Sequence, residues 1–191
     1  MEHVKILAFA GSLRKDSYNK KLLKVAQALL PSNATMEIFD LEGIPPFNPD
    51  LEPPEIVKTF KAKIKSADAL LIATPEYNYS IPGVLKNAID WASFPPNDNA
   101  FDGKPVAVIS ASIGMLGGAR AQYHLRQIFV FLNMIPVNRP EVFVTFAHKK
   151  FDENGNLMDE DAKKFLKQLL ENLVNLAKLV KIGKEMKILA N

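Results

Sequence analysis

The sequence predicts an α/β fold in which an open, doubly wound sheet of five parallel strands carries helices on both faces. Strand-like and helical segments alternate about five times along the 191 residues, which is the order that builds a parallel sheet with helical crossovers. The segments at 68–74 and 106–110 also contain continuous apolar runs, at 69–73 and 106–109, as expected of parallel strands covered on both faces. A chain of this length is ordinarily one domain, so we expect a single domain over residues 1–191.

Each strand is predicted from a short apolar run bounded by polar or turn-forming residues. The first run ends at Gly11, and the second precedes a loop at 43–50 that is rich in proline. The five predicted strands cover residues 4–10, 36–39, 68–74, 106–110 and 142–144.

The helices are predicted from apolar residues at three- and four-residue spacing. Pro82 can occupy the first position of the third helix, because a proline there loses no hydrogen bond. The last helix has an apolar stripe from Leu166 to Val180. The predicted helices lie at 22–30, 55–66, 82–92, 122–132 and 166–180.

The composition argues against several classes of site. There is no cysteine, which excludes disulfides, thiolate metal sites and iron–sulfur clusters. The three histidines have no partner at ligand spacing, so we predict no metal site. A net charge of +3 is too small to indicate nucleic-acid binding. The N-terminus shows no signal-peptide pattern and no apolar run reaches the roughly 20 residues that cross a bilayer, so we expect a cytoplasmic protein without membrane insertion.

The first candidate loop, at 11–19, leaves a strand and enters a helix. It carries Ser12, Arg14, Ser17 and Asn19. Hydroxyls, backbone N–H groups and a helix N-terminus together bind anions, and a guanidinium can clamp a phosphate with two hydrogen bonds. The dinucleotide and P-loop glycine patterns are missing, which favours a terminal monophosphate. A polar helix cap with Ser17 at the N-cap is the alternative interpretation.

The second candidate loop, at 74–83, places Tyr77, Asn78, Tyr79 and Ser80 between prolines. Flat apolar rings beside hydrogen-bonding groups suit a planar heteroaromatic ligand with polar edges. The alternative is a turn whose tyrosines merely pack.

The third candidate loop, at 110–120, contains Ser112, Gly114 and other small residues that let a ligand approach the backbone. Alone it is a weak signal, since such loops are usually turns. In a doubly wound sheet, however, the loops at the carboxyl ends of the strands meet where ligands bind. The three loops together therefore indicate a phosphorylated ring compound.

These segments resemble the NADPH-dependent FMN reductase family. The sequence G-S-L-R-x-x-S-Y-N at 11–19 is similar to the phosphate loop of that family, and P-E-Y-N-Y-S-I-P-G-V-L-K-N-A-I-D-W at 75–91 resembles its flavin-ring segment almost throughout. The segment at 117–127 resembles the branch of bacterial chromate and quinone reductases and azoreductases. The resemblance covers about residues 4–141 and implies a flavodoxin-like three-layer sandwich.

The resemblance implies an FMN-dependent NAD(P)H oxidoreductase. NADPH or NADH would deliver hydride to bound FMN, which would then reduce a small acceptor such as a quinone, an azo compound, chromate or free flavin. No side chain need act as acid or base, so no catalytic residue is predicted. The implied phosphate ligands are Ser12, Arg14, Ser17 and Asn19. The residues implied around the isoalloxazine ring are Pro75, Glu76, Tyr77, Asn78, Tyr79, Ser80, Ser112 and Gly114.

The alternative function is a non-catalytic electron carrier of the flavodoxin type. Flavodoxins are usually acidic, whereas this chain is mildly basic and carries Arg14 in its phosphate loop. Mixing the protein with FMN, NADPH and a quinone separates the two, because only an enzyme turns over repeatedly.

The relatives implied by the resemblance are dimers or tetramers, so a homodimer or homotetramer is expected. Arg120, Tyr123 and Glu141 are a candidate polar network at such an interface. His124 lies in a helix that is expected to pack, which favours a structural role over a metal or proton-relay role. Trp91 and Phe94 could line an acceptor pocket or could pack in a core or interface.

Overall fold

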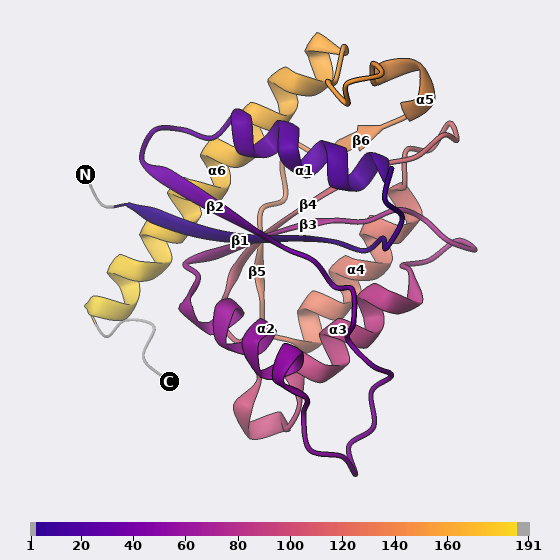
Figure 1. The fold of residues 1–191 in the computed structure, drawn as a ribbon. Helices are drawn as coiled ribbons and strands as arrows, with labels where there is room; N and C mark the ends of the chain where they lie inside the picture. The colour runs from indigo at the N-terminus through magenta and orange to yellow at the C-terminus, as the bar shows by residue number, and fades with distance from the viewer. Residues whose placement is uncertain (1–2, 187–191) are drawn as a thin grey trace.

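The computed structural model describes residues 3–186 and confirms a flavodoxin-like parallel α/β fold (Figure 1). The ends of the predicted domain, 1–2 and 187–191, lie outside the described residues. The strands are β1 (Val4–Ala10), β2 (Ala34–Phe39), β3 (Ala69–Ala73), β4 (Pro105–Ala111), β5 (Ile135–Pro136) and β6 (Val142–Val144). The helices are α1 (Tyr18–Ala28), α2 (Glu55–Ser66), α3 (Gly83–Ser93), α4 (Ala119–Phe131), α5 (Ala147–Lys150) and α6 (Glu160–Glu185), with a 3-10 turn at Pro96–Asp98.

The sheet has six strands over these residues rather than the predicted five. The strand order is β2-β1-β3-β4-β5, and every pairing is parallel. β5 pairs with the first residues of β4, and β6 pairs with its last residues. The two short strands therefore both lie beside β4, one after the other along its length. β5 was not predicted, because it has only two residues and one of them is a proline, whose nitrogen cannot donate a hydrogen bond to a neighbouring strand.

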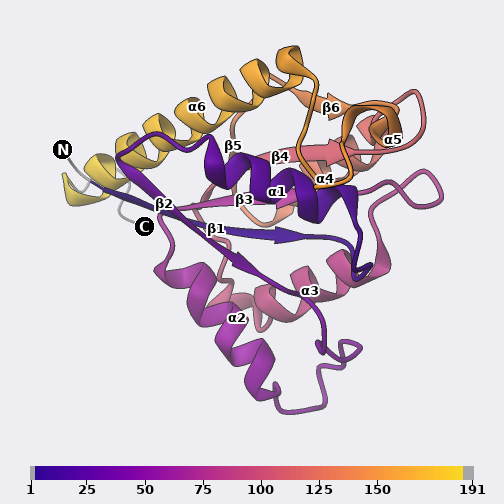
Figure 2. The same cartoon turned by 45° about the horizontal axis from the view of Figure 1, so that its top comes forward.

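Two hydrophobic cores lie on opposite faces of the sheet. Alternate residues of a strand point to opposite faces, so Ile6 and Ala8 of β1 pack beneath α1 and α6, whereas Leu7 and Phe9 pack against α2, α3 and α4. Figure 2 shows these two helix layers above and below the strands. The predicted placement of helices on both faces is therefore confirmed.

The helix boundaries differ from those expected, most at the last helix, where α6 covers Glu160–Glu185 and not only 166–180, and the short helix α5 was not predicted. Pro82 is the N-cap of α3 rather than its first residue, and α1 ends at Ala28, so that Leu29 and Leu30 lie beyond the helix and are half-buried. α4 begins at Ala119, three residues before the predicted start. Within residues 3–186, no helix combines the length and the apolar character needed to cross a bilayer.

Candidate functional site

The three candidate loops meet at the carboxyl ends of β1, β3 and β4. They enclose a hollow of about 240 Å³, which we call the flavin hollow after the ligand that the family resemblance implies. Its lining residues are Ser12, Arg14, Ser17, Tyr18, Asn19, Pro75, Glu76, Tyr77, Ala111, Ser112 and Ile113. Tyr18, Ala111 and Ile113 were not among the predicted site residues, although each lies within one of the predicted loops. The predicted residues Asn78, Tyr79, Ser80 and Gly114 lie outside this lining.

The first loop ends at a capped helix. The hydroxyl oxygen of Ser17 accepts hydrogen bonds from Asn19 N at 3.2 Å and Lys20 N at 3.5 Å, so Ser17 is the N-cap of α1. Ser12 is buried, and its hydroxyl oxygen accepts from Arg14 N at 3.4 Å. The exposed Arg14 guanidinium has no hydrogen-bond or ion-pair partner within residues 3–186. An unpaired cation thus lies beside the positive end of a helix, which is the arrangement that binds phosphate.

Asn19 joins the first loop to the third. Its side-chain Nδ2 donates to Ala111 O at 2.9 Å, and Ala111 N donates to Asn19 Oδ1 at 3.0 Å. Asn19 is only 2% exposed. Because one N–H of its amide remains after these bonds, Asn19 can donate to a ligand while it holds the two loops together.

The second loop is a tight two-residue turn. Tyr77 N donates to Ser80 O at 2.9 Å, and Ser80 N donates to Tyr77 O at 3.0 Å. The two central residues, Asn78 and Tyr79, have φ angles of 49° and 69°, as in a type I′ turn. Asparagine tolerates this left-handed region, but a bulky tyrosine rarely adopts it. The turn presents the rings of Tyr77 and Tyr79 to the exterior.

Arg120 at the start of α4 holds this turn in place. Its Nε lies 2.6 Å from Glu76 Oε1, and its backbone N donates to Glu76 Oε2 at 3.1 Å. Its guanidinium carbon lies 3.5 Å from the centroid of the Tyr79 ring. Desolvation alone would lower the pKa of Arg120, but the bonds to Glu76 and Tyr79 outweigh it and raise that pKa, so the guanidinium remains charged.

His124 adds a second tie one helical turn further along α4. Its Nδ1 lies 3.0 Å from Ser80 Oγ, and the residue is exposed. The helix packs as expected, through Leu125 and Phe129, but the His124 side chain itself is exposed and contacts the second loop. Tyr123 instead hydrogen-bonds to Glu141, which raises the pKa of the phenol. Within residues 3–186, Arg120 thus contacts the second loop, whereas Tyr123 and Glu141 form a separate pair.

The third loop depends on two glycines. Gly117 and Gly118 have φ angles of 60° and 91°, and a Cβ on Gly118 would lie 2.7 Å from Ser110 Cβ. The Ser110 hydroxyl donates to Gly117 O at 2.6 Å. Ser112 Oγ accepts from Gly114 N at 3.1 Å, so these two predicted residues form one local turn beside the flavin hollow.

The aromatic residues after the second loop have separate roles. Trp91 is 3% exposed, and its indole N–H donates to Pro45 O at 2.8 Å. It therefore packs beneath the proline-rich loop. Phe94 is 39% exposed and lies edge-on to Phe47, with ring centroids 5.6 Å apart. The two phenylalanines line a separate shallow hollow of about 260 Å³.

The residues around the flavin hollow fit FMN. The unpaired guanidinium of Arg14 and the N-terminus of α1 provide donors for a phosphate on one side. The exposed ring of Tyr77 and the backbone of the second loop provide an apolar surface with polar edges on the other. This pairing of a phosphate site with a flat surface suits a phosphorylated tricycle.

Known proteins resemble this chain along most of its length. Residues 4–149 match the NADPH-dependent FMN reductase family. The chain is 49% identical over 175 residues to an NAD(P)H-dependent FMN reductase of Pseudomonas aeruginosa, a match that covers 90% of this chain and 94% of that relative. It is 42% identical over 170 residues to a 2-hydroxy-1,4-benzoquinone reductase of a Burkholderia species, covering 88% and 93% of the two chains.

A solved structure agrees with these sequence matches. The flavoenzyme FerB of Paracoccus denitrificans, an NAD(P)H:acceptor oxidoreductase, is similar in structure with a TM-score of 0.84 and 37% identity. That match covers 92% of this chain and 97% of FerB. With a family match over residues 4–149 and relatives above 40% identity across nearly their whole length, this chain belongs to the NADPH-dependent FMN reductase family.

Proposed function

We propose that this protein is an FMN-dependent NAD(P)H oxidoreductase that reduces small acceptors of the quinone type. The convergence of three loops around one hollow carries the proposal, because it joins a phosphate site to an aromatic surface. Membership of the NADPH-dependent FMN reductase family supplies the cofactor class. The relative that bears a benzoquinone reductase name supports the class of acceptor.

Bound FMN supplies the redox chemistry, since a flavin accepts hydride from a nicotinamide and passes electrons on. Arg14, the N-terminus of α1 and the hydroxyls of Ser12 and Ser17 would hold its phosphate. The segment from Pro75 to Ser80 would lie along its ring, with Ser112 and Gly114 approaching from the third loop.

The protein contributes orientation rather than acid or base groups. Arg120 and His124 fix the turn of the second loop from α4, and Asn19 fixes the first loop to the third. A rigid set of loops would keep the ring in a single orientation. Holding the reacting groups in the right geometry lowers the entropic part of the reaction barrier. We assign no side chain a proton-transfer role.

We further propose that the protein is a homodimer or homotetramer. Val130 and Phe131 on α4 are 83% and 89% exposed, and large apolar side chains left on a surface mark protein contacts. Light scattering of the purified protein tests this proposal, and a stable monomer at micromolar concentration would contradict it. The use of NADPH or NADH as the donor supports a cytoplasmic location, which cell fractionation tests.

Steady-state turnover tests the enzymatic function. Protein loaded with FMN is mixed with NADPH or NADH and an excess of benzoquinone, and nucleotide oxidation is followed by absorbance. We expect many turnovers for each flavin and parallel lines in double-reciprocal plots, because the nucleotide leaves before the acceptor binds. The matched control omits the quinone. Oxidation that stops after one nucleotide per flavin would indicate an electron carrier and would overturn the proposal.

A further inference from the structure

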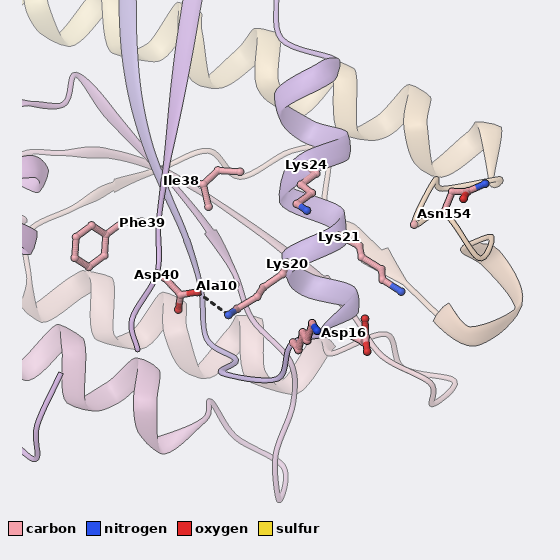
Figure 3. A pocket seen from close by; sticks show the side chains of 11 residues that line it. Ala10, Asp16, Lys20, Lys21, Lys24, Ile38, Phe39, Asp40 and Asn154 are labelled. Carbon is pink, nitrogen blue, oxygen red and sulfur yellow. Dashed lines mark hydrogen bonds and ion pairs between the residues drawn. The ribbon is translucent and has the colours of Figure 1, made fainter. Parts of the chain in front are cut away.

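A second cavity, of about 400 Å³, lies beside the first loop (Figure 3). It opens where β1 and β2 end and is bounded by α1. The first loop divides its residues between the two cavities: Arg14 and Ser17 line the flavin hollow, whereas Lys15 and Asp16 line this second cavity. Because Lys20, Lys21 and Lys24 also line it, we call it the lysine pocket.

The lysine pocket carries an excess of positive charge. Four lysines and two aspartates line it, which leaves a formal charge of 4 − 2 = +2. Lys20 is neutralised by Asp40, at 2.7 Å between Nζ and Oδ2, and Figure 3 shows this pair. The amines of Lys15, Lys21 and Lys24 have no ion-pair partner in the described part of the chain. Lys21 points toward the turn that contains Asn154, and its Nζ lies 5.5 Å from the centroid of the Tyr18 ring. A recess lined by an excess of ammonium groups attracts a multiply charged anion.

The turn before α6 holds one of these lysines in place. Gly155 adopts a φ of 83°, and a Cβ there would lie 3.4 Å from Cγ and Cδ of Lys21. The turn is closed by Asp152, whose backbone oxygen accepts from Gly155 N at 3.0 Å and whose Oδ1 accepts from Asn156 N at 2.7 Å. Asn154 of the same turn adds an amide to the lining of the pocket. The Lys21 stem is therefore packed against an ordered turn.

The position of the lysine pocket relates it to the flavin hollow. In the sheet order β2-β1-β3-β4, the lysine pocket lies at the ends of β2 and β1, and the second and third loops follow β3 and β4. Neighbouring strands are about 4.8 Å apart, so the two regions are separated by roughly 10 Å along this edge. A nicotinamide dinucleotide whose ring lies on the flavin carries its adenosine across a pyrophosphate and two riboses, which is long enough to bridge this separation.

From this juxtaposition we propose that the lysine pocket binds the 2′-phosphate of NADPH and so favours NADPH over NADH. The proposal rests on the proposed function, because it requires the nicotinamide to bind at the flavin. A phosphate monoester carries up to two negative charges, which matches the net charge of +2 that remains when Lys15, Lys21 and Lys24 are set against Asp16. NADH has only a hydroxyl at that position and gains nothing from them.

Calorimetry with nucleotide fragments tests the proposal without turnover. Protein loaded with FMN is titrated with 2′,5′-ADP and, as the matched probe, with 5′-AMP, which lacks only the 2′-phosphate. We expect 2′,5′-ADP to bind at least about tenfold more tightly, a difference of about 1.4 kcal/mol, because its 2′-phosphate can accept charge-assisted hydrogen bonds from the lysines. Equal affinity for the two fragments would overturn the proposal.

Two double variants locate the effect. Lys21→Met/Lys24→Met removes two of the unpaired charges and should abolish the preference for 2′,5′-ADP. Lys164→Met/Lys167→Met removes two exposed lysines at the same spacing on α6 and should leave it unchanged. An equal loss in both would show a general effect of net charge and would contradict a site in the lysine pocket.

Kinetics separates this proposal from the proposed function. In Lys21→Met/Lys24→Met we expect the KM for NADPH to rise about tenfold more than the KM for NADH. If the wild type turns over with NADH and quinone but shows no 2′-phosphate preference, only the lysine-pocket proposal fails. If the wild type retains no flavin, the proposed function itself fails.

Discussion

Arg120 stacks on Tyr79, with its guanidinium carbon 3.5 Å from the centroid of the tyrosine ring. Tyr79 has a φ of 69°, a conformation that is unfavourable for a bulky residue. The same guanidinium pairs with Glu76, so one side chain from α4 stabilises both the strained residue and the residue at the base of the turn. Strain of this kind persists only where the surroundings enforce it, and it gathers at ligand sites.

This relationship predicts coupling between Arg120 and Glu76 in flavin binding. Arg120→Ala should weaken FMN binding several-fold, because the second loop loses its anchor. In a Glu76→Gln background the same substitution should cost less, with a coupling of about 1 kcal/mol for a partly exposed pair. Quenching of flavin fluorescence measures each affinity. The control is Arg139→Ala, which removes an exposed arginine away from the turn, and strictly additive effects would contradict the coupling.

Asn19 is predicted to stabilise the fold as well as the site. Asn19→Ala leaves the N–H and C=O of Ala111 without their side-chain partners, and each such buried group costs about 1–3 kcal/mol. We therefore expect the free energy of unfolding to fall by about 2–4 kcal/mol, as measured by urea denaturation of the apoprotein. Asn97→Ala, at an exposed position, is the control. A loss as small as that of the control would show that the bridge between the loops is dispensable.

Two glycines should respond in opposite ways to the same substitution. Gly118→Ala places a methyl group 2.7 Å from Ser110 Cβ at a φ of 91°, so we expect a loss of at least about 2 kcal/mol in the free energy of unfolding. Gly83→Ala adds a methyl group in the first turn of α3 with nothing within 4 Å. It should be neutral or should stabilise the protein by up to about 1 kcal/mol. Similar unfolding midpoints for the two variants would contradict this account of the third loop.

The lowered pKa of Lys104 leads to a prediction of how the stability of the fold depends on pH. Burial, with a contribution from Lys184, lowers its pKa to about 8, although Asp68 acts in the other direction. The ordinary value is 10.5, so between about pH 8 and 10.5 the folded protein binds fewer protons than the unfolded chain. The contribution of Lys104 to the free energy of unfolding must therefore rise with pH across this window.

The measurement for Lys104 is a comparison of two proteins. The free energies of unfolding of the wild type and of Lys104→Met are determined by urea denaturation at intervals from pH 7 to 10.5. We expect the free energy of unfolding of the wild type to rise relative to that of the variant as pH rises. The reason is that the buried amine no longer carries the desolvation cost of its charge once it has lost its proton. A difference that stays constant or falls would contradict the lowered pKa.

Sequence reasoning succeeded where the information is local. β1, β3 and β4 each contain a continuous apolar run of four or five residues, and the helical stripe of α2 gave its bounds of 55–66 without error. The loops were found because strand ends in a parallel sheet share an edge. Ser17 is both the predicted helix cap and a residue of the flavin hollow, so its two interpretations are compatible.

The contacts that organise the site could not be predicted, because they join distant residues. Asn19 and Ala111 are 92 positions apart, and Glu76 and Arg120 are 44 apart. No local pattern marks such pairs, and the contact of His124 with Ser80 was missed for the same reason, since Ser80 lies on another element. The lysine pocket likewise exists only after α1, the end of β2 and the turn at 154–155 meet.

The central claim is that the flavin hollow binds FMN with its phosphate on the first loop. Titration of the apoprotein with FMN and with riboflavin, which lacks the phosphate, tests it most directly. We expect one FMN per chain, and we expect Arg14→Ala to weaken FMN binding by about 1.5–3 kcal/mol while riboflavin binding hardly changes. Absence of saturable FMN binding, or an equal effect of Arg14→Ala on both flavins, would contradict the claim.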